Sequence, residues 1–324
     1  MLDEVTRTIV DCPELQEWPG IEAILTKRKP GTGSLLKIAY ESTANTAIDA
    51  LPIQAAMACF VVNCILIDDV LDEDGKGAWK TIGAGRAANL AAALQARQQI
   101  LILESNLSDP QKLGATRLLS EMSLLLTQSQ ERATRSHVDL ESYWALVHGK
   151  SGNVCGTAMS IGALLGGASP EETEILYQIG KKMGEVGQIS NDLRGAFDEQ
   201  VNPDWGMPGC SLPILLARTT EHPDLEELKM LLAKGLHPGE DLKRAQEILI
   251  QSGAVRSCCD EIARRLDAMY QGLCACSLPG KAVLWQKIGE DIRHAIDWVN
   301  ALEIEQSDET KRIFDGLSKG LSSG

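Results

Sequence analysis

The chain has 324 residues, a formal net charge of -14 at pH 7 and a hydrophobic fraction of 44%. Such a fraction can build a sizeable core, which argues against a disordered chain. The negative charge comes without a basic stripe, so nucleic acid is not expected as a partner. The apolar runs are too short for a transmembrane helix, and the residues from Met1 onward show no signal peptide. We therefore expect a cytoplasmic protein with no transmembrane segment.

Helical signals dominate, because Ala, Leu, Glu and Gln fill long windows while strand-like alternation is nearly absent. The pattern predicts a helix pair over 34–74, interrupted near Leu51-Pro52, and a helix beginning at Asp109-Pro110. Further helices are predicted over residues 3–17, 86–105, 137–167, 170–200, 211–220, 223–234, 238–251, 255–275, 280–303 and 307–318. The economical interpretation is one all-α bundle over residues 1–324, with 1–33 as an N-terminal segment and 319–324 as a loose tail.

A dense acidic cluster follows the apolar run 55–67. Its carboxylates belong to Asp68, Asp69, Asp72, Glu73 and Asp74. On a helix, Asp68 and Asp72 lie on one face, one turn apart, with Asp69 beside them. Like charges at this spacing repel each other, so the cluster needs protons or cations. Hard divalent ions take oxygen ligands, and Mg2+ usually shares its shell with substrate phosphates, which predicts a metal site here. The plain alternative is a solvated acidic helix end.

A second polar segment lies in the other half of the chain. Asn191, Gly195 and Glu199 recur every fourth residue, so we expect them to share one helix face. Amide and carboxylate oxygens at this spacing can hold a hard cation, and Gly195 would leave room for a water or a phosphate oxygen. Taken alone, the segment is better interpreted as an ordinary polar face. Together with the first cluster, it predicts a central cavity with metal ions on both walls, suited to a diphosphate.

From about residue 35 to 220 the chain resembles the polyprenyl (isoprenyl diphosphate) synthase family, which has the class I isoprenoid synthase fold. Asp68–Asp72 matches the family's first aspartate-rich motif, Asp-Asp-x-x-Asp, and Gly187–Asp192 stands where the second motif is expected. Lys150-Ser151-Gly152 resembles the Lys-Thr-Gly segment, whose lysine contacts the allylic diphosphate. Ser211-Leu212-Pro213-Ile214 resembles the Thr-Leu-Pro segment that follows the second motif.

The resemblance implies Mg2+-dependent ionisation of an allylic isoprenyl diphosphate, three Mg2+ ions when diphosphate is bound, and a homodimer. The catalytic residues that it implies are Asp68, Asp69, Asp72, Asn191 and Glu199, of which Asp68, Asp72, Asn191 and Glu199 are the metal ligands. The substrate-binding residues that it implies are Lys150, Gln188, Asp192, Arg194, Phe60, Asn63 and Cys64. The last three precede the first motif, where family members set the chain length of the product.

The chain also departs from the family. The N-terminal Gly-Gly-Lys-Arg-x-Arg segment is replaced by residues 31–37, which hold no arginine, and the two arginines expected after the first motif are replaced by Asp74-Gly75-Lys76-Gly77. A compact anionic co-substrate such as isopentenyl diphosphate would bind poorly without this arginine clamp. Moreover, the pattern Asn191-Asp192-x-x-Gly195-x-x-x-Glu199 resembles the metal motif of class I terpene synthases.

The favoured hypothesis is therefore a terpene synthase, a cyclase or lyase that releases diphosphate, built on a polyprenyl synthase scaffold. Low aromatic content (4%) weighs against it, since few rings are available to stabilise carbocations. One alternative is a prenyltransferase, which either elongates isoprenyl diphosphates or alkylates another acceptor such as a peptide. A lesser alternative is a non-catalytic regulatory subunit.

Overall fold

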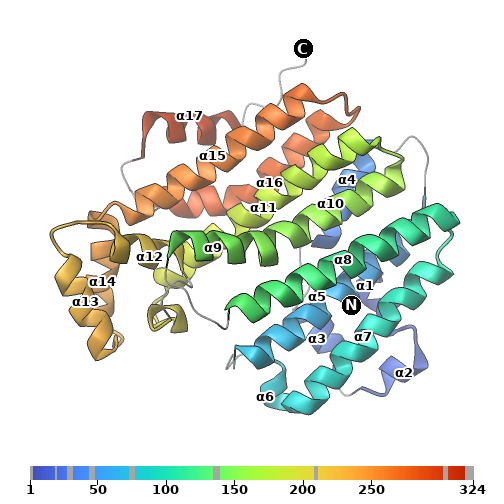
Figure 1. Ribbon diagram of the computed structural model, residues 1–324, viewed down its shortest axis with the longest axis horizontal. Helices are drawn as coiled ribbons and strands as arrows, with labels where there is room; N and C mark the ends of the chain where they lie inside the picture. The colour runs from blue at the N-terminus through green and yellow to red at the C-terminus, as the bar shows by residue number, and fades with distance from the viewer. Residues whose placement is uncertain are drawn as a thin grey trace. The chain divides into compact units, whose positions relative to one another are not determined.

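The computed structural model describes residues 3–18, 20–27, 32–43, 48–72, 77–133, 139–207, 211–301 and 306–317. Over these ranges the secondary structure is helical and contains no strand, which confirms the predicted all-α class (Figure 1). The helices are α1 (Glu4–Val10), α2 (Pro13–Gln16), α3 (Ile21–Lys27), α4 (Thr32–Thr43), α5 (Leu51–Leu71), α6 (Trp79–Ile82), α7 (Ala84–Glu104), α8 (Asp109–Ala133), α9 (Leu140–Val147), the π-helix η1 (His148–Gly152), α10 (Asn153–Gly166), α11 (Pro170–Ala196), the 3-10 helix η2 (Pro203–Trp205), α12 (Leu212–Thr219), α13 (Leu225–Lys234), α14 (Glu240–Gln251), α15 (Ala254–Ala275), α16 (Lys281–Ala301) and α17 (Asp308–Gly316).

Most predicted helices are present, with differences at a few breaks. The predicted helix 3–17 is divided into α1 and α2, because the residue before Pro13 is disfavoured in the helical region, and Cys12 is extended instead. The short helices α3 and α6 were not predicted. The predicted helix 137–167 contains the π-helical turn η1 between α9 and α10.

The chain is grouped into two compact units, each made of two stretches. The first unit comprises Met1–Leu124 and Thr157–Tyr177, and the second comprises Leu125–Gly156 and Gln178–Gly324. The expectation of a single domain over residues 1–324 stays a prediction.

The core of the first unit is built around α5. Its side chains Met57, Phe60 and Leu66 are fully buried, and α7 runs beside it while α1 and α4 also pack on it (Figure 1). Among the described residues, α5 is the one helix that is long and apolar enough to cross a membrane, by length and composition only. Because 56% of its most apolar window is buried, a core helix accounts for this composition.

Helix α1 is fixed to α7 by a buried arginine. Arg97, on α7, donates hydrogen bonds to the carbonyl oxygens of Thr8 (2.9 Å), Ile9 (3.2 Å) and Asp11 (3.0 Å). The last carbonyls of a helix have no partner within the helix, so a donor at this position satisfies them. The positive charge of the guanidinium also interacts favourably with the negative end of the helix dipole.

In the second unit, α11 approaches the η1–α10 segment so closely that only glycine fits. A Cβ on Gly184 would lie 2.2 Å from the carbonyl oxygen of Ser151, and one on Gly180 would lie 2.5 Å from that of Cys155. Gly149 faces Ser129 in the same way. The absence of a side chain at Gly180 and Gly184 thus lets α11 pack directly on the η1–α10 backbone.

Gly184→Ala is expected to destabilise the protein, although alanine is the better helix former. Its methyl group would collide with backbone atoms of η1, and such overpacking costs roughly 1–3 kcal/mol. Gly187→Ala on the same helix is the matched control, because nothing lies within 4 Å of its added Cβ and the change should stabilise the protein by about 0.5–1 kcal/mol. Urea unfolding measures both. Equal stabilities of the two variants would contradict the close approach.

Candidate active site

The first acidic cluster lies at the carboxyl end of α5. The helix ends at Leu71, and the backbone N–H of Asp72 still donates to the carbonyl oxygen of Asp68 at 2.8 Å. Asp69 is buried, Asp68 is half-buried and Asp72 is exposed. No basic residue stands in the last turn of α5, so the carboxylates add to the negative end of the helix dipole. This arrangement is unfavourable unless a cation lies nearby.

The chemistry of this donor set suits a divalent cation. Asp68 and Asp72, one turn apart, offer the carboxylate oxygens that Mg2+ prefers. Beyond the motif the chain returns against Asp69, since a Cβ on Gly77 would lie 2.8 Å from the Asp69 Cβ. Glu73 and Asp74 lie outside the described residues. Among the described side chains, no three His, Cys, Asp or Glu residues are grouped so that they could hold a metal ion. The assignment of Asp68 and Asp72 as metal ligands thus stays a prediction.

The three residues predicted to set chain length lie on α5 before the cluster. Phe60 is fully buried, while Asn63 and Cys64 are half-buried. Burial, with a further contribution from the charge of Asp68, raises the pKa of the Cys64 thiol to about 12. Cys64 is therefore a neutral thiol at physiological pH, which is compatible with an apolar pocket. The pocket-lining role of these residues stays a prediction.

In the second unit, the carboxylate of Asp192 is buried (3% exposed) and ties three helical segments together. Its Oδ2 accepts hydrogen bonds from the Tyr143 hydroxyl of α9 at 2.6 Å and from the Leu212 N–H, at the start of α12, at 2.9 Å. Its Oδ1 accepts from Gln188 Nε2, one turn earlier on α11, at 2.8 Å. These three hydrogen bonds hold the carboxylate inside the protein, and the predicted role of Asp192 in substrate binding stays a prediction.

The π-helix η1 holds the lysine segment beside the second motif. The Ser151 hydroxyl donates to Gln188 Oε1 at 2.9 Å, so a chain of hydrogen bonds runs from Ser151 through Gln188 to Asp192. Lys150 is half-buried in the same π-helical turn. Single π-helical turns occur frequently at functional sites. The structure thus brings together Lys150-Ser151 and Gln188-Asp192, two motifs that were identified separately in the sequence.

The two remaining polar candidates on α11 contact each other. Arg194 donates from Nη2 to Asn191 Oδ1 at 2.8 Å, and both side chains are exposed. The amide oxygen predicted as a metal ligand therefore accepts a hydrogen bond from the residue predicted to offset phosphate charge. Their roles toward metal and diphosphate stay predictions.

The expectation that Glu199 shares a helix face with Asn191 is wrong. Helix α11 ends at Ala196, and Gln246 Nε2 donates to the carbonyl oxygens of Ala196 (3.1 Å) and Asp198 (3.0 Å). These bonds satisfy carbonyls that a continuing helix would have used itself. Glu199 consequently lies exposed beyond the helix end.

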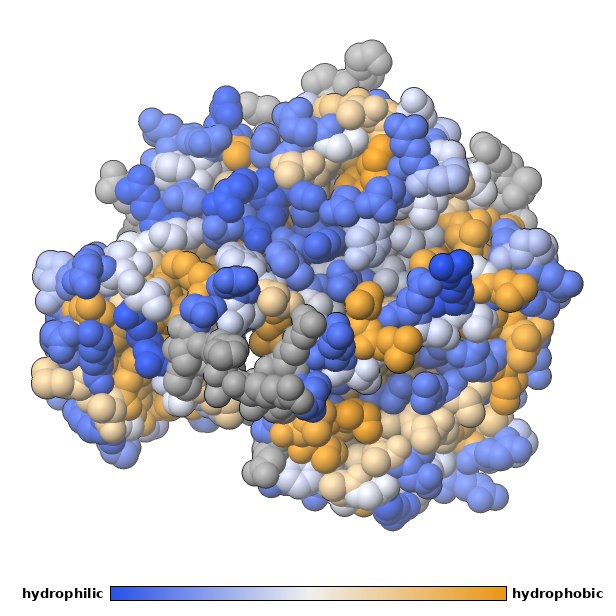
Figure 2. All heavy atoms as spheres, viewed as in Figure 1, coloured by the Kyte–Doolittle hydropathy of each residue, from blue (hydrophilic) through white to orange (hydrophobic). Residues whose placement is uncertain are grey.

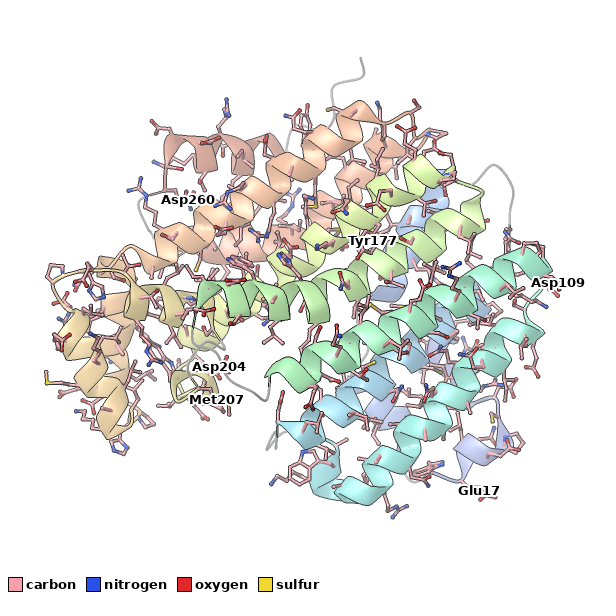
Figure 3. All side chains as sticks on the ribbon, viewed as in Figure 1. Glu17, Asp109, Tyr177, Asp204, Met207 and Asp260 are labelled. Atoms are coloured by element: carbon pink, nitrogen blue, oxygen red, sulfur yellow. The ribbon has the colours of Figure 1, made fainter. Side chains whose placement is uncertain are left out.

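The space predicted beside Gly195 is also filled. A Cβ there would lie 2.6 Å from Asn202 Nδ2, whose Oδ1 accepts from the backbone N–H of Asp204 at 3.0 Å and caps η2 (Figure 3 labels Asp204). Gly195 therefore makes room for a returning loop rather than for a water or a phosphate oxygen. The contact of Gln246 with Ala196 joins residues 50 positions apart in sequence and gives no local signal, whereas Asn202 belongs to the segment that directly follows α11.

Asp192 should give the protein an unusual pH dependence. Burial raises the pKa of this carboxyl group from 3.8 to about 6, against the lowering effect of its three hydrogen bonds. Between these values the folded state binds more protons than the unfolded state, so this group makes the free energy of unfolding fall as pH rises from about 4 to 6. Over this range the free energy of unfolding should fall by roughly 2–3 kcal/mol because of this group.

Asp192→Asn removes this titration, so the stability difference between the variant and the wild type should change with pH over the same window. Chemical unfolding at half-unit pH intervals measures it. Parallel curves for the two proteins would contradict the raised pKa.

An all-α chain with aspartates at the end of a buried helix and a Gln-x-x-Asn-Asp segment defines a protein with the isoprenoid synthase fold. A crystal structure of a geranylgeranyl pyrophosphate synthase superposes with a TM-score of 0.76 at 19% identity, covering 88% of this chain and 95% of the other. A geranylgeranyl pyrophosphate synthase from Corynebacterium glutamicum, complexed with calcium and isoprenyl diphosphate, gives a TM-score of 0.68 at 21% identity, covering 91% and 94%.

The family model described as Polyprenyl synthetase matches residues 32–249. The chain therefore belongs to the polyprenyl synthetase family. This confirms the recognition made from the motifs.

Two curated relatives come from Mycobacterium tuberculosis (strain ATCC 25618 / H37Rv). A dimethylallyltranstransferase is 32% identical over 127 residues, which are 37% of this chain and 39% of the relative. A nonaprenyl diphosphate synthase is 26% identical over 229 residues, 67% of this chain and 68% of the relative. The chain thus spans well under half of the first relative's length.

Proposed function

We propose that this protein is a Mg2+-dependent prenyltransferase that transfers the allylic group of an isoprenyl diphosphate to an acceptor. The observation that carries the proposal is the set of three aspartates at the carboxyl end of α5, inside the segment matched by the polyprenyl synthetase family. The names of both relatives, a transferase of dimethylallyl groups and a nonaprenyl diphosphate synthase, support prenyl transfer. The calcium and isoprenyl diphosphate held by one structural neighbour support a divalent metal.

In this proposal, the bond between C1 of the allylic group and the diphosphate oxygen breaks, and its electron pair leaves with the diphosphate. Asp68 and Asp72 would hold Mg2+, which would neutralise the charge of the leaving diphosphate. The ammonium group of Lys150 would offset further phosphate charge. Apolar side chains of α5 before the cluster would exclude water from the allylic cation. A π electron pair of the acceptor would then form the bond to C1, and the acceptor would lose a proton to the released diphosphate.

The terpene synthase hypothesis was based on the missing arginines and on the pattern Asn191-Asp192-x-x-Gly195-x-x-x-Glu199. That pattern needs a continuous helix through Glu199 and open space at Gly195, whereas α11 ends at Ala196 and Asn202 lies against Gly195. We therefore prefer prenyl transfer to cyclisation. Because the arginines that bind isopentenyl diphosphate in the family are missing, the proposal does not specify the acceptor. It covers isopentenyl diphosphate as well as an uncharged acceptor such as a peptide side chain. A cytoplasmic homodimer with three Mg2+ ions per active site completes the proposal.

Incubation with allylic diphosphates of ten, fifteen and twenty carbons tests the proposal. With Mg2+ and 14C-labelled isopentenyl diphosphate, labelled products longer than the allylic substrate, analysed after dephosphorylation, would support prenyl transfer and identify isopentenyl diphosphate as the acceptor. Hydrocarbons formed from a single diphosphate, with or without the co-substrate, would overturn prenyl transfer in favour of the terpene synthase.

Asp68→Ala should lower product formation by at least a hundredfold, because it removes a carboxylate from the proposed metal site. Glu121→Ala, which removes an exposed carboxylate on α8, is the matched control and should retain activity. If Asp68→Ala stays active, the assignment of the metal site is wrong.

A further inference from the structure

A basic hollow opens on the second unit between α11 and α15. It has a volume of about 240 Å3, and its lining includes Lys181, Lys182, Arg264, Arg265 and Glu185. The surface over these two helices is predominantly hydrophilic (Figure 2). None of the candidate active-site residues lines it. In a chain with a net charge of -14, a concave site with four cationic side chains is unusual.

The two arginines form a fixed wall of this hollow. Arg265 donates from Nε to the buried carboxylate of Glu185 at 2.7 Å, and its guanidinium lies 4.2 Å from the ring centroid of Trp144. Arg264 donates from both Nη atoms to the two carboxylate oxygens of Glu261, at 2.7 Å each. Planar guanidinium groups held by carboxylates and an aromatic ring lose little further freedom when a ligand binds.

Unlike the two arginines, Lys181 and Lys182 have ammonium groups that form no ion pair or hydrogen bond within the described part of the chain. The Lys181 stem packs against Gly152, since a Cβ at that glycine would lie 3.1 Å from Lys181 Cγ. Lys182 is half-buried, and burial lowers the pKa of its ammonium group despite the nearby charge of Glu185. A positive charge that is partly removed from water favours an anionic partner.

We propose that this hollow binds a small phosphate-bearing anion, with the ammonium groups of Lys181 and Lys182 contacting its oxygens. Four cationic side chains face two carboxylates, Glu185 and Glu261, so the cluster keeps positive charge for a ligand. The volume suits a phosphate or diphosphate group, and Ala268 is the one purely apolar side chain in the lining, so a long isoprenoid chain would find little apolar contact. Charge-assisted bonds to phosphate oxygens are among the strongest available at such a site.

The test uses the full chain in EDTA, so that a metal-dependent active site does not contribute. Isothermal titration with inorganic diphosphate compares the wild type, Lys181→Met/Lys182→Met and the control Lys229→Met/Lys243→Met, which removes two exposed lysines from α13 and α14. Binding should weaken about tenfold or more in the first variant and stay unchanged in the control. A parallel arm measures sedimentation with vesicles of phosphatidic acid, against phosphatidylcholine, because a lipid headgroup presents the same phosphate chemistry.

A readout without variants is the rate of lysine acetylation in the wild-type protein, measured by mass spectrometry. Diphosphate should protect Lys181 and Lys182 at least several-fold relative to Lys229. Lysine-dependent binding of either diphosphate or phosphatidic acid supports the site, and the two arms identify its source. Absence of binding in both arms, equal binding by both variants, or equal protection of all three lysines would overturn it.

Discussion

The structure of the second unit depends on one buried charge, the carboxylate of Asp192. An aspartate that is 3% exposed is costly in the charged form, and only its three donors make it tolerable. The donors come from α9, α11 and the start of α12, so this one side chain fixes where the lysine-bearing π-helix and the Leu-Pro segment lie along α11. The second motif thus contains a carboxylate that joins helical segments of this unit.

The first unit has the opposite arrangement, with its acidic side chains at the end of a core helix. Helix α5 is apolar along most of its length and places Asp68, Asp69 and Asp72 at its negative end. Such a helix end attracts cations. It lies inside the segment that the polyprenyl synthetase family model matches, which is why we propose it as the site that binds a diphosphate through divalent metal. The basic hollow between α11 and α15 concentrates positive charge elsewhere on an acidic protein.

Local patterns in the sequence were sufficient to predict most of the helices and to locate both motifs, but not the short helices α3 and α6. Apolar periodicity and proline or glycine signals place most helix ends within a few residues, and Asp68–Asp72 is recognisable from its spacing alone. The end of α11 was not predicted: Gln246, 50 positions away in sequence, donates to the last carbonyl of this helix, and the following segment turns back so that Asn202 lies against Gly195. The same applies to Asp192, whose burial depends on Tyr143 and on the segment at Leu212. Sequence reasoning therefore extended one helix face from Asn191 to Glu199, whereas α11 ends at Ala196; the roles of these residues toward metal stay predictions.

The central claim is that the aspartates at the end of α5 bind a diphosphate through divalent metal. Its most direct test is calorimetric titration of the protein with a non-reactive thio-diphosphate analogue of an allylic substrate, in Mg2+ and in EDTA. The account predicts binding in Mg2+ that is lost in EDTA and in Asp68→Ala. Equal affinity in Mg2+ and EDTA, or unchanged affinity in the variant, would contradict it.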